Sequence, residues 1–288
     1  MIQYLRRKQI DIDKYDNCIQ NASNSRIYAL SYYLDIVADN WDALVLNDYE
    51  AVMPLPWRSK YFIKYIYTPC WTQQLGVFSI PKLSTELVDQ FIKAIPKKFL
   101  KTSIYFNSES QPSSFVQKRD NYILDLNDSY SDICKNFNKN RKRIIVKLNT
   151  LEHTLIKNDS LDNFSSTLKK KDSGLFINNT DKKILFRLIS KSIKLNKGQV
   201  ISVILDNSIE ASFFITFHKK IITNLIPIST KKGKEKNLPT LVINHIIKTN
   251  QQTDKILDFE GSMIPGVAQF YKSFGSTLEN YFQFTKRF

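Results

Sequence analysis

The sequence contains few cysteines, histidines, glycines and prolines. Its three cysteines, Cys18, Cys70 and Cys134, are far apart and form no CxxC pair, and only three histidines accompany them. A disulfide framework or a structural zinc site needs more of these residues at shorter spacing, so we predict neither, and no metal. With 7 Gly and 9 Pro among 288 residues, collagen-like and low-complexity chains are also excluded.

Long hydrophobic runs are missing as well. The first residues, MIQYLRRKQIDID, are charged where a secretion signal requires an apolar run. The most apolar stretch, residues 211–228, is interrupted by His218, Lys219, Lys220 and Asn224. We therefore expect a cytoplasmic protein without a membrane span.

Acidic residues are scarce relative to basic ones. The 27 Asp and Glu face 42 Lys and Arg, which gives a formal net charge of +15. This excess suits an anionic ligand such as a nucleotide, a CoA thioester or a tRNA, although an excess of Lys in a chain rich in Asn and Ile also fits a general compositional bias. A hydrophobic share of 42% with 12% aromatics indicates a folded chain of one large or two ordinary domains.

The sequence contains the same order of predicted elements twice. Residues 43–46 with 49–55, and residues 202–205 with 209–217, have the pattern of a β-hairpin. Each hairpin is followed by a third strand, an amphipathic helix, a fourth strand and a closing strand that begins with tyrosine. These are residues 61–67, 83–95, 103–106 and 122–126 in the first half, and residues 221–228, 238–246, 256–259 and 281–284 in the second. The order predicts two copies of one mixed α/β unit.

The predicted fold class is therefore α/β (α+β), with two tandem mixed sheets flanked by helices. We expect residues 1–126 to form the first domain and residues 127–288 the second, with a linking helix within 127–150. Residues 130–148 carry a stripe of apolar side chains, which also includes Arg141, at helical spacing. The opposite face is basic and is either simply solvated or a surface for RNA; its residues are Lys135, Lys139, Lys142, Arg143 and Lys147.

Three segments resemble a known family. Residues 255–276, KILDFEGSMIPGVAQFYKSFGS, are similar to a strand, loop and helix of FemABX-like proteins, and their ending Phe270-Tyr271-x-x-Phe274-Gly275 is similar to a helix of GNAT enzymes. Residues 138–147, NKNRKRIIVK, resemble a basic helix of the same branch. The runs MPLPWRSKY and TQQLGVF resemble the first half of acetyltransferase-like bacterial proteins. The chain thus resembles the GNAT acyltransferase superfamily, in its tandem-domain FemABX-like branch.

The resemblance implies an N-acyltransferase that moves an acyl group to an amine by direct attack. It implies an acyl-CoA, such as acetyl-CoA, as donor and a small-molecule or peptide amine as acceptor. Two alternatives stay open. One is an aminoacyl-tRNA-dependent FemABX-like transferase that acts on a cell-wall precursor, with tRNA as a partner. The other is a catalytically silent scaffold or RNA-binding protein of the same fold.

The loop that would hold the donor departs from the GNAT pattern. In that pattern, Gln/Arg-x-x-Gly-x-Gly/Ala, main-chain amides hold the CoA pyrophosphate, whereas residues 230–237 read TKKGKEKN. The incomplete pattern adds weight to a donor other than CoA. We still predict that four residues of this loop bind the donor: Lys231, Lys232, Gly233 and Lys234. The first half has no such basic cluster in the corresponding loop, and there we predict acceptor binding by Arg58, Gln73 and Gln74.

Three residues of the second half are candidates for catalysis. Because side chains alternate along a strand, Asp258 and Glu260 are predicted to share one face at the strand's end, where one of them could act as a base or anchor an ammonium group. An exposed sheet edge or a helix cap is the alternative. Tyr271 stands where many GNAT enzymes have a general-acid tyrosine, and its phenol could protonate a leaving thiolate; its alternative is an ordinary place in the core.

Overall fold

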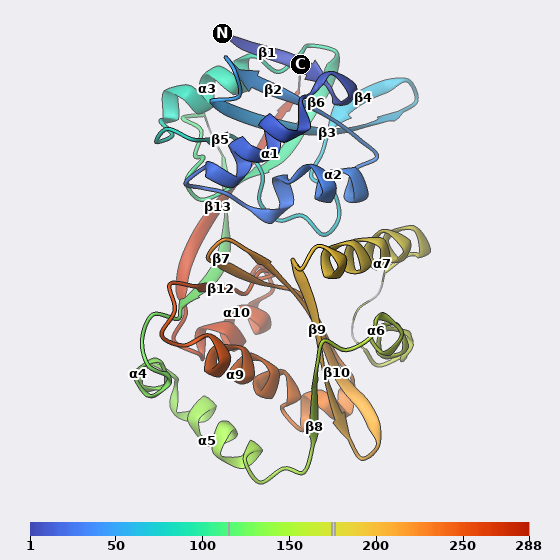
Figure 1. Cartoon of the computed structure of the whole chain (residues 1–288), viewed down its shortest axis with the longest axis vertical. Helices are drawn as coiled ribbons and strands as arrows, with labels where there is room; N and C mark the ends of the chain where they lie inside the picture. Colours follow the sequence, from blue (N-terminus) through green and yellow to red (C-terminus); the bar gives the residue numbers. More distant parts are fainter. Residues whose placement is uncertain (115, 174, 176, 288) are drawn as a thin grey trace. The chain divides into compact units, whose positions relative to one another are not determined.

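The computed structural model describes every residue except 115, 174, 176 and 288. By its internal contacts the chain divides into two compact units (Figure 1). Unit 1 comprises Met1–Asp120 with Glu279–Phe288, and unit 2 comprises Asn121–Leu278. Among the helices that the structure describes, none is long and apolar enough to cross a membrane.

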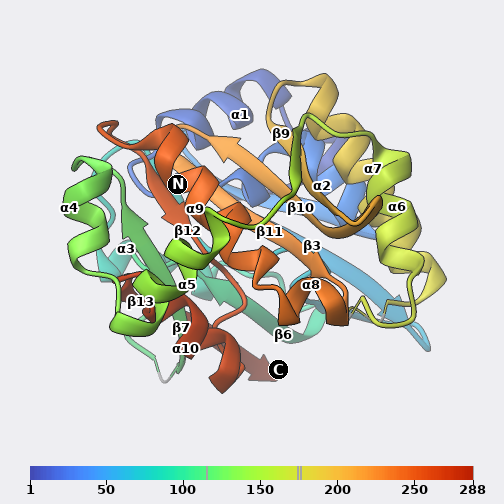
Figure 2. The same cartoon turned by 90° about the horizontal axis from the view of Figure 1, so that it is seen from below.

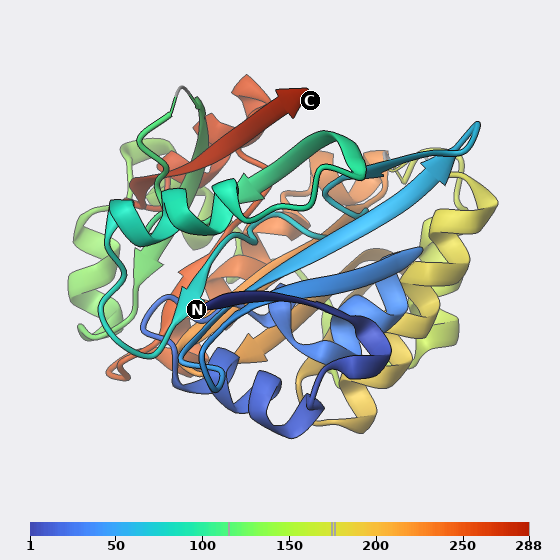
Figure 3. The same ribbon diagram turned by 90° about the horizontal axis from the view of Figure 1, so that it is seen from above.

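Unit 1 is built on a mixed sheet. Its strands, in spatial order, are β1 (Ile2–Arg6), β2 (Asn40–Leu46), β3 (Ala51–Lys60), β4 (Ile63–Ile66), β6 (Phe99–Phe106) and β13 (Thr277–Arg287), and the short β5 (Phe78–Ser79) also pairs with β3. The pair β4–β6 is parallel, and the neighbouring pairs β3–β4 and β6–β13 are antiparallel. Helices α1 (Ile12–Asn21) and α2 (Ser31–Val37) lie on one face, and α3 (Thr85–Lys93) lies on the other (Figure 3). The short helices η1 (Arg7–Gln9) and η2 (Ile27–Ala29) complete this unit.

Unit 2 is built on a sheet of the same order. Its strands are β8 (Thr154–Lys157), β9 (Gly198–Leu205), β10 (Ser208–His218), β11 (Ile221–Ser229), β12 (Ile256–Asp258) and β7 (Gln117–Asp125), of which β11 and β12 form a parallel pair. Helices α6 (Leu161–Lys169) and α7 (Asn179–Lys194) cover one face and α9 (Leu238–Asn250) covers the other (Figure 2). The remaining helices are α4 (Tyr130–Lys135), α5 (Lys139–Leu148), α8 (Lys231–Glu235) and α10 (Pro265–Lys272).

The two sheets confirm the predicted fold class. Each has a hairpin, a third strand, a parallel fourth strand reached through a helix, and a closing strand antiparallel to the fourth. The parallel pair occupies the same place in both, as β4–β6 and as β11–β12. The predicted domain limits, 1–126 and 127–288, stay a prediction about the duplicated halves.

The closing strands are exchanged between the two sheets. We expected residues 122–126 to close the first sheet and residues 281–284 to close the second, and this was wrong. Instead β7 pairs with β12 of unit 2, and β13 pairs with β6 of unit 1. The apolar alternation in each strand shows that one of its faces is buried, but it carries no information about the partner strand.

The predicted linking helix is two helices. α4 ends at Lys135 and α5 begins at Lys139, because the side chain of Asn138 accepts a hydrogen bond from the Arg141 amide and so caps α5. Phe137, between the helices, is 3% exposed and packs edge-on against Phe274 with the ring centroids 5.4 Å apart. The break lets one aromatic side chain enter the core, while the predicted basic residues of both helices remain exposed.

Substitution of Gly275, which follows α10, tests this packing. Gly275 has φ of +73°, and a Cβ there would lie 2.6 Å from the Cβ of Asn136 and 2.9 Å from its carbonyl oxygen. Gly275→Ala should therefore lower the free energy of unfolding by at least about 1 kcal/mol, as measured by urea denaturation. Gly266→Ala is the control: its Cβ would meet nothing within 4 Å, and alanine favours the helix. Equal stability of the two variants would contradict this account.

Candidate functional site

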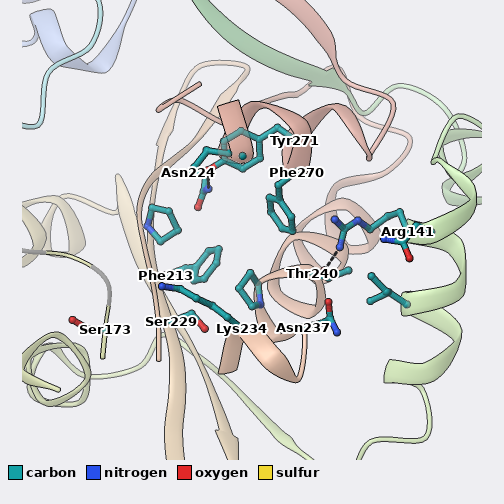
Figure 4. Close-up of a pocket in the computed structure, with 16 residues that line it drawn as sticks. Arg141, Ser173, Phe213, Asn224, Ser229, Lys234, Asn237, Thr240, Phe270 and Tyr271 are labelled. Carbon is teal, nitrogen blue, oxygen red and sulfur yellow. Dashed lines mark hydrogen bonds between the residues drawn. The ribbon is translucent and has the colours of Figure 1, made fainter. Parts of the chain in front are cut away.

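Unit 2 contains a cavity of about 470 Å³ beside β11 (Figure 4). Its walls come from α5, β10, β11, the segment from α8 to the start of α9, and α10. The lining residues are Asn140, Arg141, Ile144, Ser173, Phe213, Asn224, Pro227, Ser229, Lys234, Asn237, Pro239, Thr240, Gly266, Val267, Phe270 and Tyr271. The volume is in the range of cavities that hold small-molecule ligands.

The cavity lies where two parallel strands part. β11 pairs with β12 only from Ile221 to Thr223, although β11 continues to Ser229. On its other side, β11 has two residues between Thr223 and Ile226, Asn224 and Leu225, where β10 has only Ile215, which is a β-bulge. Main-chain groups of β11 beyond Thr223 are therefore not used in the ladder with β12. They are available to a ligand.

The bulge places Asn224 in the cavity wall. Asn224 is 1% exposed, and its Nδ2 lies 3.4 Å from the hydroxyl of Tyr271. Its Oδ1 is buried without a hydrogen-bond partner among the described residues. A buried amide oxygen that lacks a partner costs free energy unless a ligand or water satisfies it. Asn224 was not among the predicted residues, although a side-chain amide in a largely apolar strand is a signal that could have identified it.

Tyr271 packs in the hydrophobic core and also lines the cavity. It is 4% exposed, and its ring stacks on Phe259 with the centroids 4.6 Å apart, while the residue lines the cavity. Burial raises the pKa of this phenol, and the carboxyl groups of Glu260 and Asp258 raise it further when they are ionised. The hydroxyl therefore stays protonated at neutral pH and can act only as a proton donor or a neutral hydrogen-bond partner.

The two predicted carboxylates lie near Tyr271, but not as the strand pattern implied. β12 ends at Asp258, and Glu260 has left-handed backbone with φ of +51°, so strand alternation does not extend to Glu260. Asp258 is 2% exposed and accepts hydrogen bonds from Asn121 Nδ2 and from the Glu260 amide, both at 3.0 Å. Among the described residues, the buried Oε1 of Glu260 has no partner, and burial raises the pKa of this carboxyl well above its ordinary value. Neither carboxylate lines the cavity.

The predicted donor loop forms α8, and several of its amide groups and charged side chains already have partners within the protein. The Lys231 amide donates to a carboxylate oxygen of Asp172 at 3.0 Å, and the side chain of Thr230 accepts from the Gly233 amide at 3.0 Å. Lys232 pairs with Asp206 at 2.8 Å. Of the four predicted donor residues, Lys234 lines the cavity.

Gly233 has a packing role in addition to its predicted one. A Cβ at this position would lie 2.2 Å from the carbonyl oxygen of Glu210, so only glycine lets α8 lie this close to β10. Glu210 in turn is 7% exposed and bonds to the side chain of Thr230. These contacts fix the turn from β11 into α8.

The predicted acceptor residues belong to unit 1 and are not among the residues that line the cavity. Arg58 lies 3.8 Å over the ring of Tyr67 and pairs with Asp39 at 3.2 Å. Gln73 and Gln74 are 9% and 0% exposed, and Gln74 Nε2 donates to Gln73 Oε1 at 3.1 Å. The structure shows the two glutamines together and Arg58 with other partners. Acceptor binding by these residues stays a prediction.

No family model and no curated protein matches this sequence. Solved structures with a similar fold include FemX, with a TM-score of 0.70, 11% identity and coverage of 98% of this chain and 96% of FemX. L-PGS from Bacillus licheniformis has a TM-score of 0.59, 11% identity and coverage of 96% and 92%. A tandem GNAT protein from the clavulanic acid biosynthesis pathway has a TM-score of 0.54, 8% identity and coverage of 99% and 98%.

These likenesses confirm the predicted resemblance at the level of the fold. The chain has a tandem GNAT-like fold of the FemX type over nearly its whole length. At identities near 10% the likeness concerns the fold and leaves the reaction open. No cluster of three or more His, Cys, Asp or Glu side chains suited to a metal ion occurs among the described residues.

The pKa of Glu260 has a measurable consequence for stability. Because the folded state holds this proton more tightly than the unfolded state, stability should fall as pH rises above the ordinary glutamate range, until the folded carboxyl ionises. Glu260→Gln should remove a slope of up to about 1.4 kcal/mol per pH unit from the free energy of unfolding. Denaturant titrations at several pH values would measure it, with the exposed Glu235→Gln as control. Parallel curves for wild type and Glu260→Gln would contradict the burial of this carboxyl.

Proposed function

We propose that the protein is an N-acyltransferase whose reaction takes place in the cavity of unit 2. The observation that carries the proposal is the bulged, unpaired edge of β11, which places Asn224 and Tyr271 around one cavity. An acyl group on this edge would meet free main-chain groups that can polarise its carbonyl. The protonated phenol of Tyr271 lines the same cavity.

The lining residues favour direct attack by the amine over a covalent enzyme intermediate. No cysteine and no histidine occurs among the described residues that line the cavity. The lining serine and threonine hydroxyls have other partners: Ser173 donates to the Leu168 carbonyl, Ser229 donates to the Glu210 carbonyl, and Thr240 accepts from Arg141. A serine or threonine nucleophile needs an adjacent base, which these residues do not have.

Tyr271 is suited to proton transfer to the leaving group. Its raised pKa keeps the proton on the phenol at neutral pH, so the hydroxyl can donate a hydrogen bond to the leaving group. An alkoxide leaving group is a stronger base than a phenolate and can take the proton, whereas a thiolate is a weaker base and receives only the hydrogen bond. Asn224 can accept a hydrogen bond from the attacking amine through its unpartnered Oδ1. The amine must arrive neutral, or lose its proton to water, since the described lining contains no carboxylate or imidazole.

The donor is an acyl-CoA or an aminoacyl-tRNA. The family resemblance favours acetyl-CoA as the simplest donor. One observation favours the second class: the Asp172 carboxylate occupies the Lys231 amide at the start of α8, where a pyrophosphate would otherwise find main-chain donors. A carboxylate there repels phosphate. The acceptor in either case is an amine on a small molecule or a peptide.

Removal of one hydroxyl tests the proposed chemistry. Tyr271→Phe keeps the ring that stacks on Phe259, so stability should change by no more than about 1 kcal/mol while the turnover number falls by about a hundredfold or more. Tyr130→Phe is a matched control, since it removes a hydroxyl that bonds to Asn244 outside the cavity lining. It should leave turnover unchanged.

The assay measures acyl transfer to a panel of amines by mass spectrometry, with acetyl-CoA in one arm and aminoacyl-tRNA in the other. Transfer from one donor identifies the donor class. No transfer from either donor to any amine, or full turnover in Tyr271→Phe, would contradict the proposed function and favour a silent scaffold of the same fold.

A further inference from the structure

The charged side chains that line the cavity are all of one sign. Arg141 and Lys234 line it, and no aspartate or glutamate occurs among the described lining residues. Neither cation has an ion-pair partner in the described part of the chain, whereas Lys232 next to the cavity is paired with Asp206. The charged side chains among the described lining residues therefore give the cavity wall a positive potential.

Arg141 is the more unusual of the two cations, because it is 5% exposed. Its Nε donates to Ser273 Oγ at 2.9 Å and its Nη1 donates to the hydroxyl of Thr240. Its guanidinium lies over the rings of Phe270 and Phe274, 4.5 and 4.6 Å from their centroids. These contacts hold the plane of the guanidinium, and Nη2 makes no hydrogen bond to any described residue.

A buried guanidinium without an anion is costly to the folded protein. Two hydroxyls and two ring faces return part of the lost hydration, but burial still lowers the pKa of Arg141 to about 10. Buried charges in folded proteins are normally paired with an opposite charge. An unpaired buried cation in a cavity wall therefore indicates that a ligand supplies the negative charge. The partner that fits is a bound oxyanion.

Lys234 stands on the other side of the cavity. Figure 4 shows Arg141 extending from α5, with Thr240 and Phe270 beside it, whereas Lys234 extends toward Phe213. Two cations at separate places fit a ligand with more than one negative charge, as a phosphate ester has, better than a single carboxylate. The rings of Phe213 and Phe270 give the rest of the ligand an apolar surface.

We propose that this cavity binds a phosphate ester, with the Arg141 guanidinium as its phosphate anchor and Lys234 as a second, solvent-exposed contact for negative charge. The inference rests on the proposed function in one respect: the ester is the acyl donor. Both donor classes, a CoA thioester and the 3′ end of a tRNA, carry phosphate esters, and this is the chemistry that they share. Inorganic phosphate alone would fill little of a cavity of about 470 Å³.

The test is a direct binding measurement by titration calorimetry on the full chain. The probes are CoA, a 5′-phosphorylated CCA trinucleotide, and their uncharged counterparts pantetheine and adenosine. Wild type should bind at least one phosphorylated probe, and Arg141→Met should weaken that binding by about 10- to 100-fold, as expected for a charge-assisted hydrogen bond. Arg143→Met removes the same charge from an exposed site on α5 and should change binding by no more than about twofold.

A second variant keeps the test decisive if Arg141→Met does not fold, as checked by thermal melting. Arg141→Lys keeps the charge but loses the planar fork, so it should bind more weakly than Arg143→Met. Binding of CoA alone or of the trinucleotide alone identifies the source of the phosphate, and either supports the site. The proposal is overturned if wild type binds neither, if pantetheine and adenosine bind as tightly as the phosphorylated probes, or if every folded Arg141 variant binds like wild type.

The same data separate this inference from the proposed function. Phosphate-dependent binding through Arg141 without acyl transfer to any amine would retain the phosphate site and reject the transferase. Acyl transfer with unchanged binding in the Arg141 variants would retain the transferase and reject the site.

Discussion

The parting of β11 from β12 after Thr223 is the constraint on which unit 2 depends. A parallel pair that continued would use the main-chain groups of both strands and leave no space between the helices that follow them. Because the ladder stops after three residues, α9 and α10 start apart, and residues near both of their amino-terminal ends line one cavity. The bulge at Asn224 and the break before α5 complete its walls, since they bring one amide and one guanidinium to the same space.

The polar groups around this opening are poorly satisfied by the protein. Asn224 Oδ1 and Glu260 Oε1 are buried without hydrogen-bond partners among the described residues, and Arg141 has no counter-charge there. Each of these lowers the stability of the fold. In natural proteins, local rules are broken mainly at functional sites, and the gathering of three such groups near one cavity is the physical reason to place the chemistry there.

Much of this arrangement could be predicted from the sequence. Hydrophobic periodicity gave the hairpins, the order of elements and the duplication, and the segment around Tyr271 pointed to the end of the sheet beside which the cavity lies. The parts that could not be predicted depend on contacts between distant residues. Nothing local in residues 230–237 shows that Asp172 caps the α8 amide, and the pattern of strand Ile256–Asp258 cannot show that the chain turns left-handed at Glu260. Arg141 stood out only as a cation on an apolar stripe.

The exchange of closing strands affects how the chain can fold during synthesis. The sheet of unit 1 has β13 beside β6, and β13 includes the last eleven residues before the final phenylalanine. A ribosome makes the other strands of that sheet long before this one, so the edge of β6 stays open until β13 has been made. Unit 2 is enclosed in sequence between the parts of unit 1 and has all its strands earlier. Of the two units, unit 1 begins first in the sequence but is completed after unit 2, which reverses the usual order for two successive domains.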